Sequence, residues 1–277
     1  MSITSSPRLW VRPPAVAGRF YPGDPHELAA LVDDLLAQAH APEPATPAPK
    51  AIIAPHAGYV FSGAVAAKAY KAVAPAKDRI RRVVMIGPAH TARFYGLATS
   101  SARAFATPLG EVTLDQAGIA RACRACPMLT VQDAAHEREH DLEVQLPFLQ
   151  RTLDAFELVP MVFGMTSAGD VASVLEELWG GEETLIVISS DLSHYHDAQT
   201  AARLDTATAE AIEAMLPYQI GEEQACGRLA IQGLLVEAQS HGLSPARLDL
   251  RHSGQTAPHL GPREQVVGYG AWSFARN

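Results

Sequence analysis

The chain has little cysteine, no long apolar run and no excess of basic residues. Its three cysteines, an odd number among 277 residues, give no disulfide framework. No apolar run approaches the roughly 18 residues that a membrane-spanning helix needs. Asp and Glu (30) outnumber Lys and Arg (22), and the net charge of −8 argues against nucleic acid or an acidic membrane as a partner.

The N-terminal segment also lacks the apolar stretch of a secretory signal peptide. Residues 1–14 are interrupted by arginine and proline. We therefore expect the protein to be cytoplasmic. The hydrophobic fraction of 48% is ordinary for a globular protein, and a chain of this length can bury a core.

Apolar segments rich in valine and isoleucine alternate with helical patterns along the chain. We expect parallel strands at 51–54, 82–87, 157–163 and 184–189, with helices between them. Strands that are apolar throughout are typical of a sheet buried on both faces. The predicted fold class is α/β, with residues 1–277 as a single domain whose central, mostly parallel or mixed sheet is flanked by helices.

Three of these strands run directly into side chains that bind metals or transfer protons. The first is followed by His56, the second by His90, and the last by Asp191 and His194. Ligands of open α/β sheets bind beyond the carboxyl ends of the strands. If the three strands are parallel neighbours, the four side chains converge there. Because imidazole is the commonest metal ligand and also titrates near neutrality, the pattern predicts a shared metal or catalytic site.

The cysteines give a weaker signal. Cys226 lies early in a helix predicted over 222–240, where a lone cysteine is by default a small buried hydrophobe. A helix N-terminus can also lower the pKa of a thiol, which suits a thiolate ligand. Cys123 and Cys126 form one CxxC pair with no second pair, and we interpret them as structural.

A second histidine pair offers an alternative. His136, His140 and Glu143 would share one face of a helix predicted near 137–153. The segment 136–140 contains the HExxH pattern of zinc hydrolases, although no third ligand follows at a familiar spacing. A zinc hydrolase using His136 and His140 is therefore one alternative function.

Six segments, spread over nearly the whole chain, resemble the Memo family, whose bacterial and archaeal members are called AmmeMemoRadiSam system protein B. The family fold is similar to that of class III extradiol dioxygenases of the LigB type, which are non-haem iron enzymes. The resemblance implies a LigB/Memo-like fold with a site at the strand ends. The segments are PAVAGRFYP (14–22), APHAGYVFSG (54–63), IGPAH (86–90), EHDLEVQLPFLQ (139–150), SSDLSHY (189–195) and VVGYGAWSF (266–274).

The resemblance implies roles for individual residues. His56, His90 and Cys226 match the family's metal ligands, and His194 matches the acid/base histidine of the dioxygenase relatives, with Asp191 beside it. Two histidines and a cysteine differ from the two-histidine, one-carboxylate set of oxygen-activating iron enzymes. We expect one metal ion. Iron(II) and copper are the favoured metals, and zinc is a further option.

The implied substrate pocket has an aromatic wall of Phe20, Tyr59 and Phe61. The predicted function is that of a metal-binding protein with a non-haem dioxygenase-like pocket for a small molecule or peptide, and a metal-dependent redox enzyme is its most specific form. The alternative is a non-catalytic metal-handling or ligand-binding protein. Because homologues are often encoded beside a radical-SAM protein, the resemblance also suggests a shared pathway with one.

Overall fold

The computed structural model describes residues 10–40, 48–260 and 264–276. They form a single α/β unit with a mixed sheet between helices, so the predicted fold class is confirmed. The signal-peptide interpretation falls partly on residues 1–9, which lie outside the described ranges, as do both ends of the predicted 1–277 domain. Within those ranges, no helix has the length and apolar character required to cross a bilayer.

The secondary structure alternates between strands and helices in chain order. The strands are β1 (Val11–Arg12), β2 (Ala51–Ala54), β3 (Arg82–Pro88), β4 (Leu97–Thr99), β5 (Ala104–Thr107), β6 (Gly110–Thr113), β7 (Leu129–Val131), β8 (Glu157–Phe163), β9 (Thr184–Ser189), β10 (His194–His196), β11 (Leu243–His252) and β12 (Val266–Arg276). The α-helices are α1 (Pro25–Gln38), α2 (Tyr59–Val73), α3 (Gln116–Ala125), α4 (Leu146–Thr152), α5 (Ala168–Leu178), α6 (Ala198–Glu213), α7 (Arg228–Ser240) and α8 (Ser253–Thr256). Short 3₁₀ helices are η1 (Ala74–Ala76), η2 (Asp133–Ala135), η3 (Glu143–Gln145) and η4 (Pro217–Gln219).

The main sheet has the strand order β10-β12-β2-β9-β3-β8-β4-β7, with β11 paired to β12. Its centre, β2-β9-β3-β8, is parallel, and β12 and β4 join it antiparallel on the two sides. The carboxyl ends of β2, β9 and β3 are therefore neighbours at one edge. This is the arrangement that the prediction of a shared site required.

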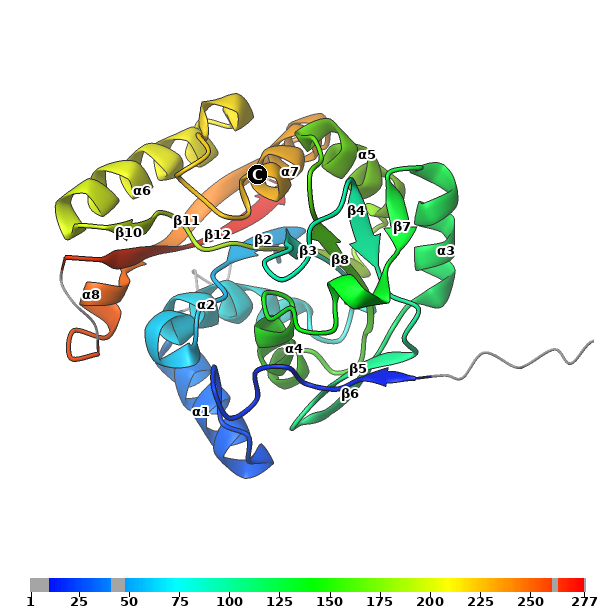
Figure 1. Cartoon of the computed structure of the whole chain (residues 1–277), viewed down its shortest axis with the longest axis horizontal. Helices are drawn as coiled ribbons and strands as arrows, with labels where there is room; N and C mark the ends of the chain where they lie inside the picture. Colours follow the sequence, from blue (N-terminus) through cyan, green and yellow to red (C-terminus); the bar gives the residue numbers. More distant parts are fainter. Residues whose placement is uncertain (1–9, 41–47, 261–263, 277) are drawn as a thin grey trace, which may run out of the picture.

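Burial explains why the central strands form. Every residue of β2 and β9 is buried, because helices cover the sheet on both faces. In Figure 1, α2 and α4 lie below the central strands, and α5 and α7 lie above them. A strand covered on both faces has no polar side to expose, which is why these segments show no polar alternation.

Local signals position several helices. α1 starts where expected, because the Asp24 carboxylate accepts hydrogen bonds from the N–H groups of His26 and Glu27, and Pro25 occupies the first helical position. α5 begins with a capping box in which Ser167 and Asp170 bond each other's backbone N–H groups.

Two predicted helices start later than expected. The helix expected near 137–153 is α4, which begins at Leu146 and follows the 3₁₀ turn η3. The helix expected over 222–240 is α7, which begins at Arg228. Cys226 therefore lies in the turn before α7 and not within it.

A candidate metal site of three histidines

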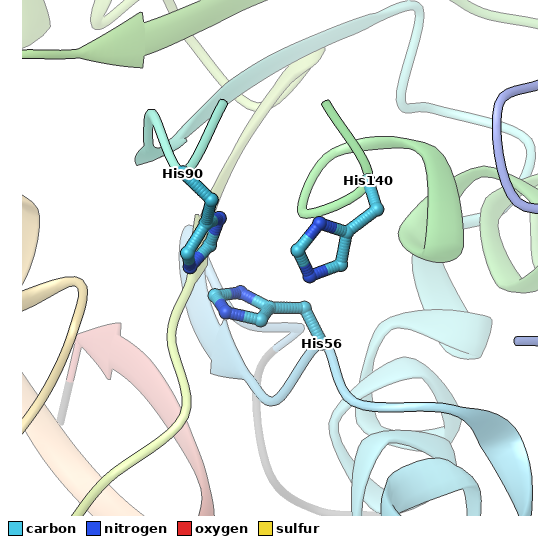
Figure 2. A group of neighbouring side chains, drawn as sticks. All are labelled: His56, His90 and His140. Carbon is cyan, nitrogen blue, oxygen red and sulfur yellow. The ribbon is translucent and has the colours of Figure 1, made fainter. Parts of the chain in front are cut away.

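Three imidazoles meet at the carboxyl edge of the sheet. His56 follows β2, His90 follows β3, and His140 comes from the turn segment before α4; their rings point toward one another (Figure 2). The ring centroids of His56 and His90 are 5.2 Å apart. The ring centroid of His140 lies 5.7 Å from that of His56 and 4.7 Å from that of His90. One ligand atom from each residue lies within 4.8 Å of the other two, so the three histidines could hold a metal ion.

Hydrogen bonds fix the tautomer of His56, which is only 2% exposed. The Ser189 hydroxyl donates its one proton to the Asp141 carbonyl, at 2.7 Å. The 3.0 Å contact between His56 Nδ1 and Ser189 Oγ therefore requires Nδ1 to donate. This leaves the lone pair of His56 on Nε2, where a metal ligand needs it.

One carboxylate holds the other two imidazoles. Glu139 Oε1 lies 2.9 Å from Nδ1 of His90 and 3.1 Å from Nδ1 of His140. Its oxygens also accept the backbone N–H groups of His90 at 2.6 Å and His140 at 2.9 Å. Because an ionised carboxylate only accepts, both Nδ1 atoms are donors, and in the neutral imidazole this leaves the lone pair on Nε2.

The charges of these groups follow from burial and hydrogen bonding. Burial alone would raise the pKa of Glu139, but the hydrogen bonds from His140 and His90 outweigh it and hold the pKa well below its usual range. Burial lowers the pKa of His56, and the neighbouring imidazoles of His90, His140 and, more weakly, His194 lower it further when they carry a proton. His56 is therefore neutral at physiological pH, as metal binding requires.

Cys226 lies against this cluster. Its Sγ is 3.3 Å from His56 Nε2, and its N–H donates to the Asp191 carbonyl at 3.3 Å. Burial raises the pKa of the thiol, and its one proton has two acceptors within reach, the His56 lone pair at 3.3 Å and the Asp191 carbonyl at 3.6 Å. The structure thus brings Cys226 beside His56, while its predicted role as a metal ligand stays a prediction.

The predicted proton-transfer residues lie at the same edge. Asp191 is 4% exposed, and its Oδ1 accepts the backbone N–H of His56 at 2.7 Å. Burial raises the pKa of this carboxyl. His194 is partly exposed on β10, next to Tyr195, whose φ of 60° is unusual for a residue other than glycine. The expected pairing of Asp191 with the His194 ring stays a prediction.

The three aromatic residues expected in the pocket have different surroundings. Phe20 packs edge-on against His140, with ring centroids 4.9 Å apart. Tyr59 is buried, and its hydroxyl donates to the Val144 carbonyl at 2.6 Å. Phe61 is partly buried against the core. Phe20 thus contacts the histidine cluster directly, and the substrate role of all three residues stays a prediction.

The HExxH interpretation requires a helix that the structure does not form. His136 is 1% exposed, and its Nε2 donates to the Ala98 carbonyl at 3.1 Å. His140 belongs instead to the cluster with His56 and His90. The two histidines of HExxH are therefore directed to different surroundings, which corrects the expectation that they share a helical face.

Arg12 explains why this segment turns. Its buried side chain donates to the carbonyls of His136 and Glu139, and to the Glu143 carboxylate at 2.5 Å. Glu143, the third member of the alternative cluster, also accepts from the Tyr21 hydroxyl at 2.6 Å. The carbonyls that would propagate a helix are instead bound by an arginine from a distant segment.

The chain is similar to known proteins over nearly its whole length. Residues 12–273 match the family described as "Memo-like protein". A MEMO1 family protein of Aquifex aeolicus is 40% identical over 94% of this chain and 97% of its own length. MEMO1 family proteins of Methanopyrus kandleri and Archaeoglobus fulgidus are 35% and 33% identical over 96% and 95% of this chain and 99% of their own lengths.

The fold and the site define an α/β protein with a histidine cluster that could bind metal at the carboxyl edge of a mixed sheet. The chain belongs to the Memo family.

Proposed function

We propose that this protein binds one metal ion through His56, His90 and His140, with the thiol of Cys226 as a fourth donor. The observation that supports this most directly is the hydrogen bonding of the three imidazoles. Each Nδ1 donates to Ser189 or Glu139, so the neutral form of each ring presents its Nε2 lone pair to an ion. Neighbouring acceptors of this kind fix the orientation of metal-binding histidines in proteins.

The distance between His56 and Cys226 fits a shared ion. Donors bound tetrahedrally, with metal–nitrogen and metal–sulfur bonds of about 2.1 and 2.3 Å, lie about 3.6 Å apart. The observed separation of His56 Nε2 and Cys226 Sγ is 3.3 Å. A small shift of one side chain therefore brings both within bonding distance of one ion.

We further propose that the metal is iron(II) or copper and that the protein is a redox enzyme acting on a small molecule at this site. A bound metal of this kind supplies electron transfer at the site. Mixed imidazole and thiolate donors favour such borderline or soft metals, although zinc accepts them too. His194, partly exposed beside the cluster, is the group placed to transfer a proton to or from a substrate. Asp191 positions His56 through its backbone N–H.

A non-catalytic metal-handling role is the second proposal. The observation that favours it is the donor set itself, because a thiol with imidazoles and no carboxylate ligand suits reversible binding of copper(I). In this role the ion is the cargo, and its release to a competing chelator is fast.

The experiment starts with protein prepared without oxygen, loaded separately with iron(II), copper(I) and zinc. Elemental analysis should give about one metal per chain. The variants His56→Ala, His90→Ala and His140→Ala should each lose it, whereas His26→Ala, which removes an exposed histidine on α1, should not. Retention of metal by all three cluster variants would reject the proposed site.

Oxygen uptake separates the two roles. The loaded protein is tested with catechols as trial substrates, and turnover that His194→Ala abolishes supports the enzyme. No turnover with any metal, together with rapid transfer of copper(I) to a chelator, supports metal handling.

A further inference from the structure

A cavity of about 500 Å³ lies at the end of the sheet opposite the histidine cluster. Its lining residues include Lys50, Ile80 and Thr184, which stand at or just before the amino ends of β2, β3 and β9. The volume is within the range of small-molecule sites in proteins. Nothing in the metal-site proposal uses this cavity.

A half-buried ammonium group forms one side of the cavity. Lys50 Nζ donates to the carbonyls of Trp179, Gly181 and Thr184, the last two at 2.7 Å. No carboxylate of residues 10–40, 48–260 and 264–276 forms an ion pair with it. Burial lowers the pKa of Lys50 to about 8, and the nearby positive charge of Arg82 lowers it further, against a partial offset from the Glu183 carboxylate.

Two guanidinium groups add to this charge. Arg79 and Arg276 are exposed and line the same cavity. Within the described part of the chain, neither side chain forms an ion pair or a hydrogen bond. Glu182 is the acidic residue of the lining, and the Glu183 carboxylate next to it also acts on the Lys50 charge, so three cations lie near two carboxylates. The residues around this cavity therefore carry an excess of positive charge, although the whole chain has a net charge of −8.

A flat aromatic surface completes the lining. The rings of Trp179 and His241 are stacked, with centroids 4.1 Å apart and planes 9° from parallel. Trp179 is largely covered, whereas the His241 side chain is 32% exposed. A planar group can therefore extend this stack on the His241 side.

We propose that this cavity binds a phosphorylated small molecule with a planar ring, of which a mononucleotide is the simplest representative. Arg79 and Arg276 contact the phosphate, because guanidinium groups bind phosphate oxygens in pairs. The Lys50 charge contributes attraction without direct contact, since its donors are already engaged. The planar ring stacks on His241.

Calorimetric titration of the whole protein with AMP tests this proposal. AMP should bind with a dissociation constant below about 1 mM, and adenosine and inorganic phosphate should each bind at least about tenfold more weakly. The double variant Arg79→Gln/Arg276→Gln should weaken AMP binding at least about tenfold. The matched control is Arg103→Gln/Arg121→Gln, which removes the same charge from two exposed arginines outside the lining and should change binding less than about twofold.

Three results would overturn the proposal. The first is no AMP binding at millimolar concentration. The second is equal weakening in both double variants, which would show only a response to net charge. The third is phosphate binding as tight as AMP binding, which would remove the role of the ring.

Discussion

Replacing Glu139 by glutamine tests how the histidine cluster is held together. The substitution keeps the size of the side chain and removes its charge. The Glu139 carboxylate accepts from Nδ1 of His90 and of His140, at 2.9 and 3.1 Å. A glutamine has one carbonyl oxygen, and its NH₂ group would face an N–H donor. At least one of the two imidazoles then loses its acceptor and can turn or change tautomer.

The expected loss of metal affinity follows from these contacts. Removal of one such acceptor typically weakens metal binding roughly 10–100-fold, or about 1.4–2.7 kcal/mol. Because Glu139 serves two ligands, we expect the upper part of that range. The backbone N–H groups of His90 and Thr91 also lose a charged acceptor, so we expect the free energy of unfolding to fall by roughly 1–3 kcal/mol.

The assay is competition with a chromophoric zinc chelator, since zinc avoids oxidation during the titration. Glu137→Gln is the matched control, because Glu137 is exposed and lies two residues away. It should leave the affinity for zinc unchanged. A folded Glu139→Gln protein with wild-type affinity would refute the inference that this carboxylate orients the ligands.

Three other substitutions test Cys226 as the fourth metal donor, the burial of His136, and the close packing of the Gly87 backbone against Asp141. Cys226→Ser should lower metal affinity at least about tenfold and leave the stoichiometry at one; unchanged affinity, measured by the same competition, would restrict the ligands to the three histidines. The pKa of His136 is about 4 when folded, lowered by burial, against about 6.5 when unfolded, so the unfolded chain takes up more protons and stability falls as the pH drops from about 6.5 to 4. Urea unfolding should therefore show that the free energy of unfolding falls between pH 7 and pH 4 by about 3 kcal/mol more in the wild type than in His136→Gln. An equal fall in both proteins would contradict the inference that burial lowers the pKa of His136. Gly87→Ala would place a Cβ 1.8 Å from Asp141 Oδ2 and should lower the free energy of unfolding by roughly 1–3 kcal/mol. Gly169→Ala, at the first turn of α5, would place a Cβ at an ordinary contact distance of 3.6 Å from Ser167 Oγ and should change it little.

The sequence predicts the elements whose signals are local. Strands β2, β3 and β9 are recognisable as apolar runs, and α1 is recognisable from its Asp24 cap and Pro25. Because strands that alternate with helices are typically joined by crossover connections and run parallel in one sheet, the sequence alone is enough to expect His56 and His90 at one edge of the sheet.

The sequence indicates His140 as a candidate ligand only together with His136, and it does not identify Glu139. Neither the place of His140 in the histidine cluster nor the role of Glu139 is predicted, because the conformation of this segment depends on distant residues. The 136–142 segment has helical spacing, yet the side chain of Arg12 binds its carbonyls from more than 120 residues away. No local pattern reports such a contact. The family motif EHDLEVQLPFLQ does mark this segment, and its adjacent glutamate and histidine are the two residues that complete the cluster.

For Cys226, the family resemblance gives a prediction that the local sequence does not. Its position before a helix gives little reason to choose a ligand over a buried thiol, and the resemblance to the Memo family alone indicates it. The turn before α7 brings its Sγ to 3.3 Å from His56 Nε2, across 170 residues of chain.

The most direct test of the account is an anomalous difference map from crystals of protein loaded with metal under anaerobic conditions. We predict one peak about 2.0–2.2 Å from Nε2 of His56, His90 and His140, with Cys226 Sγ at about 2.3 Å. A peak bound elsewhere on the chain, or no peak in crystals of protein that elemental analysis shows to be loaded, would contradict it.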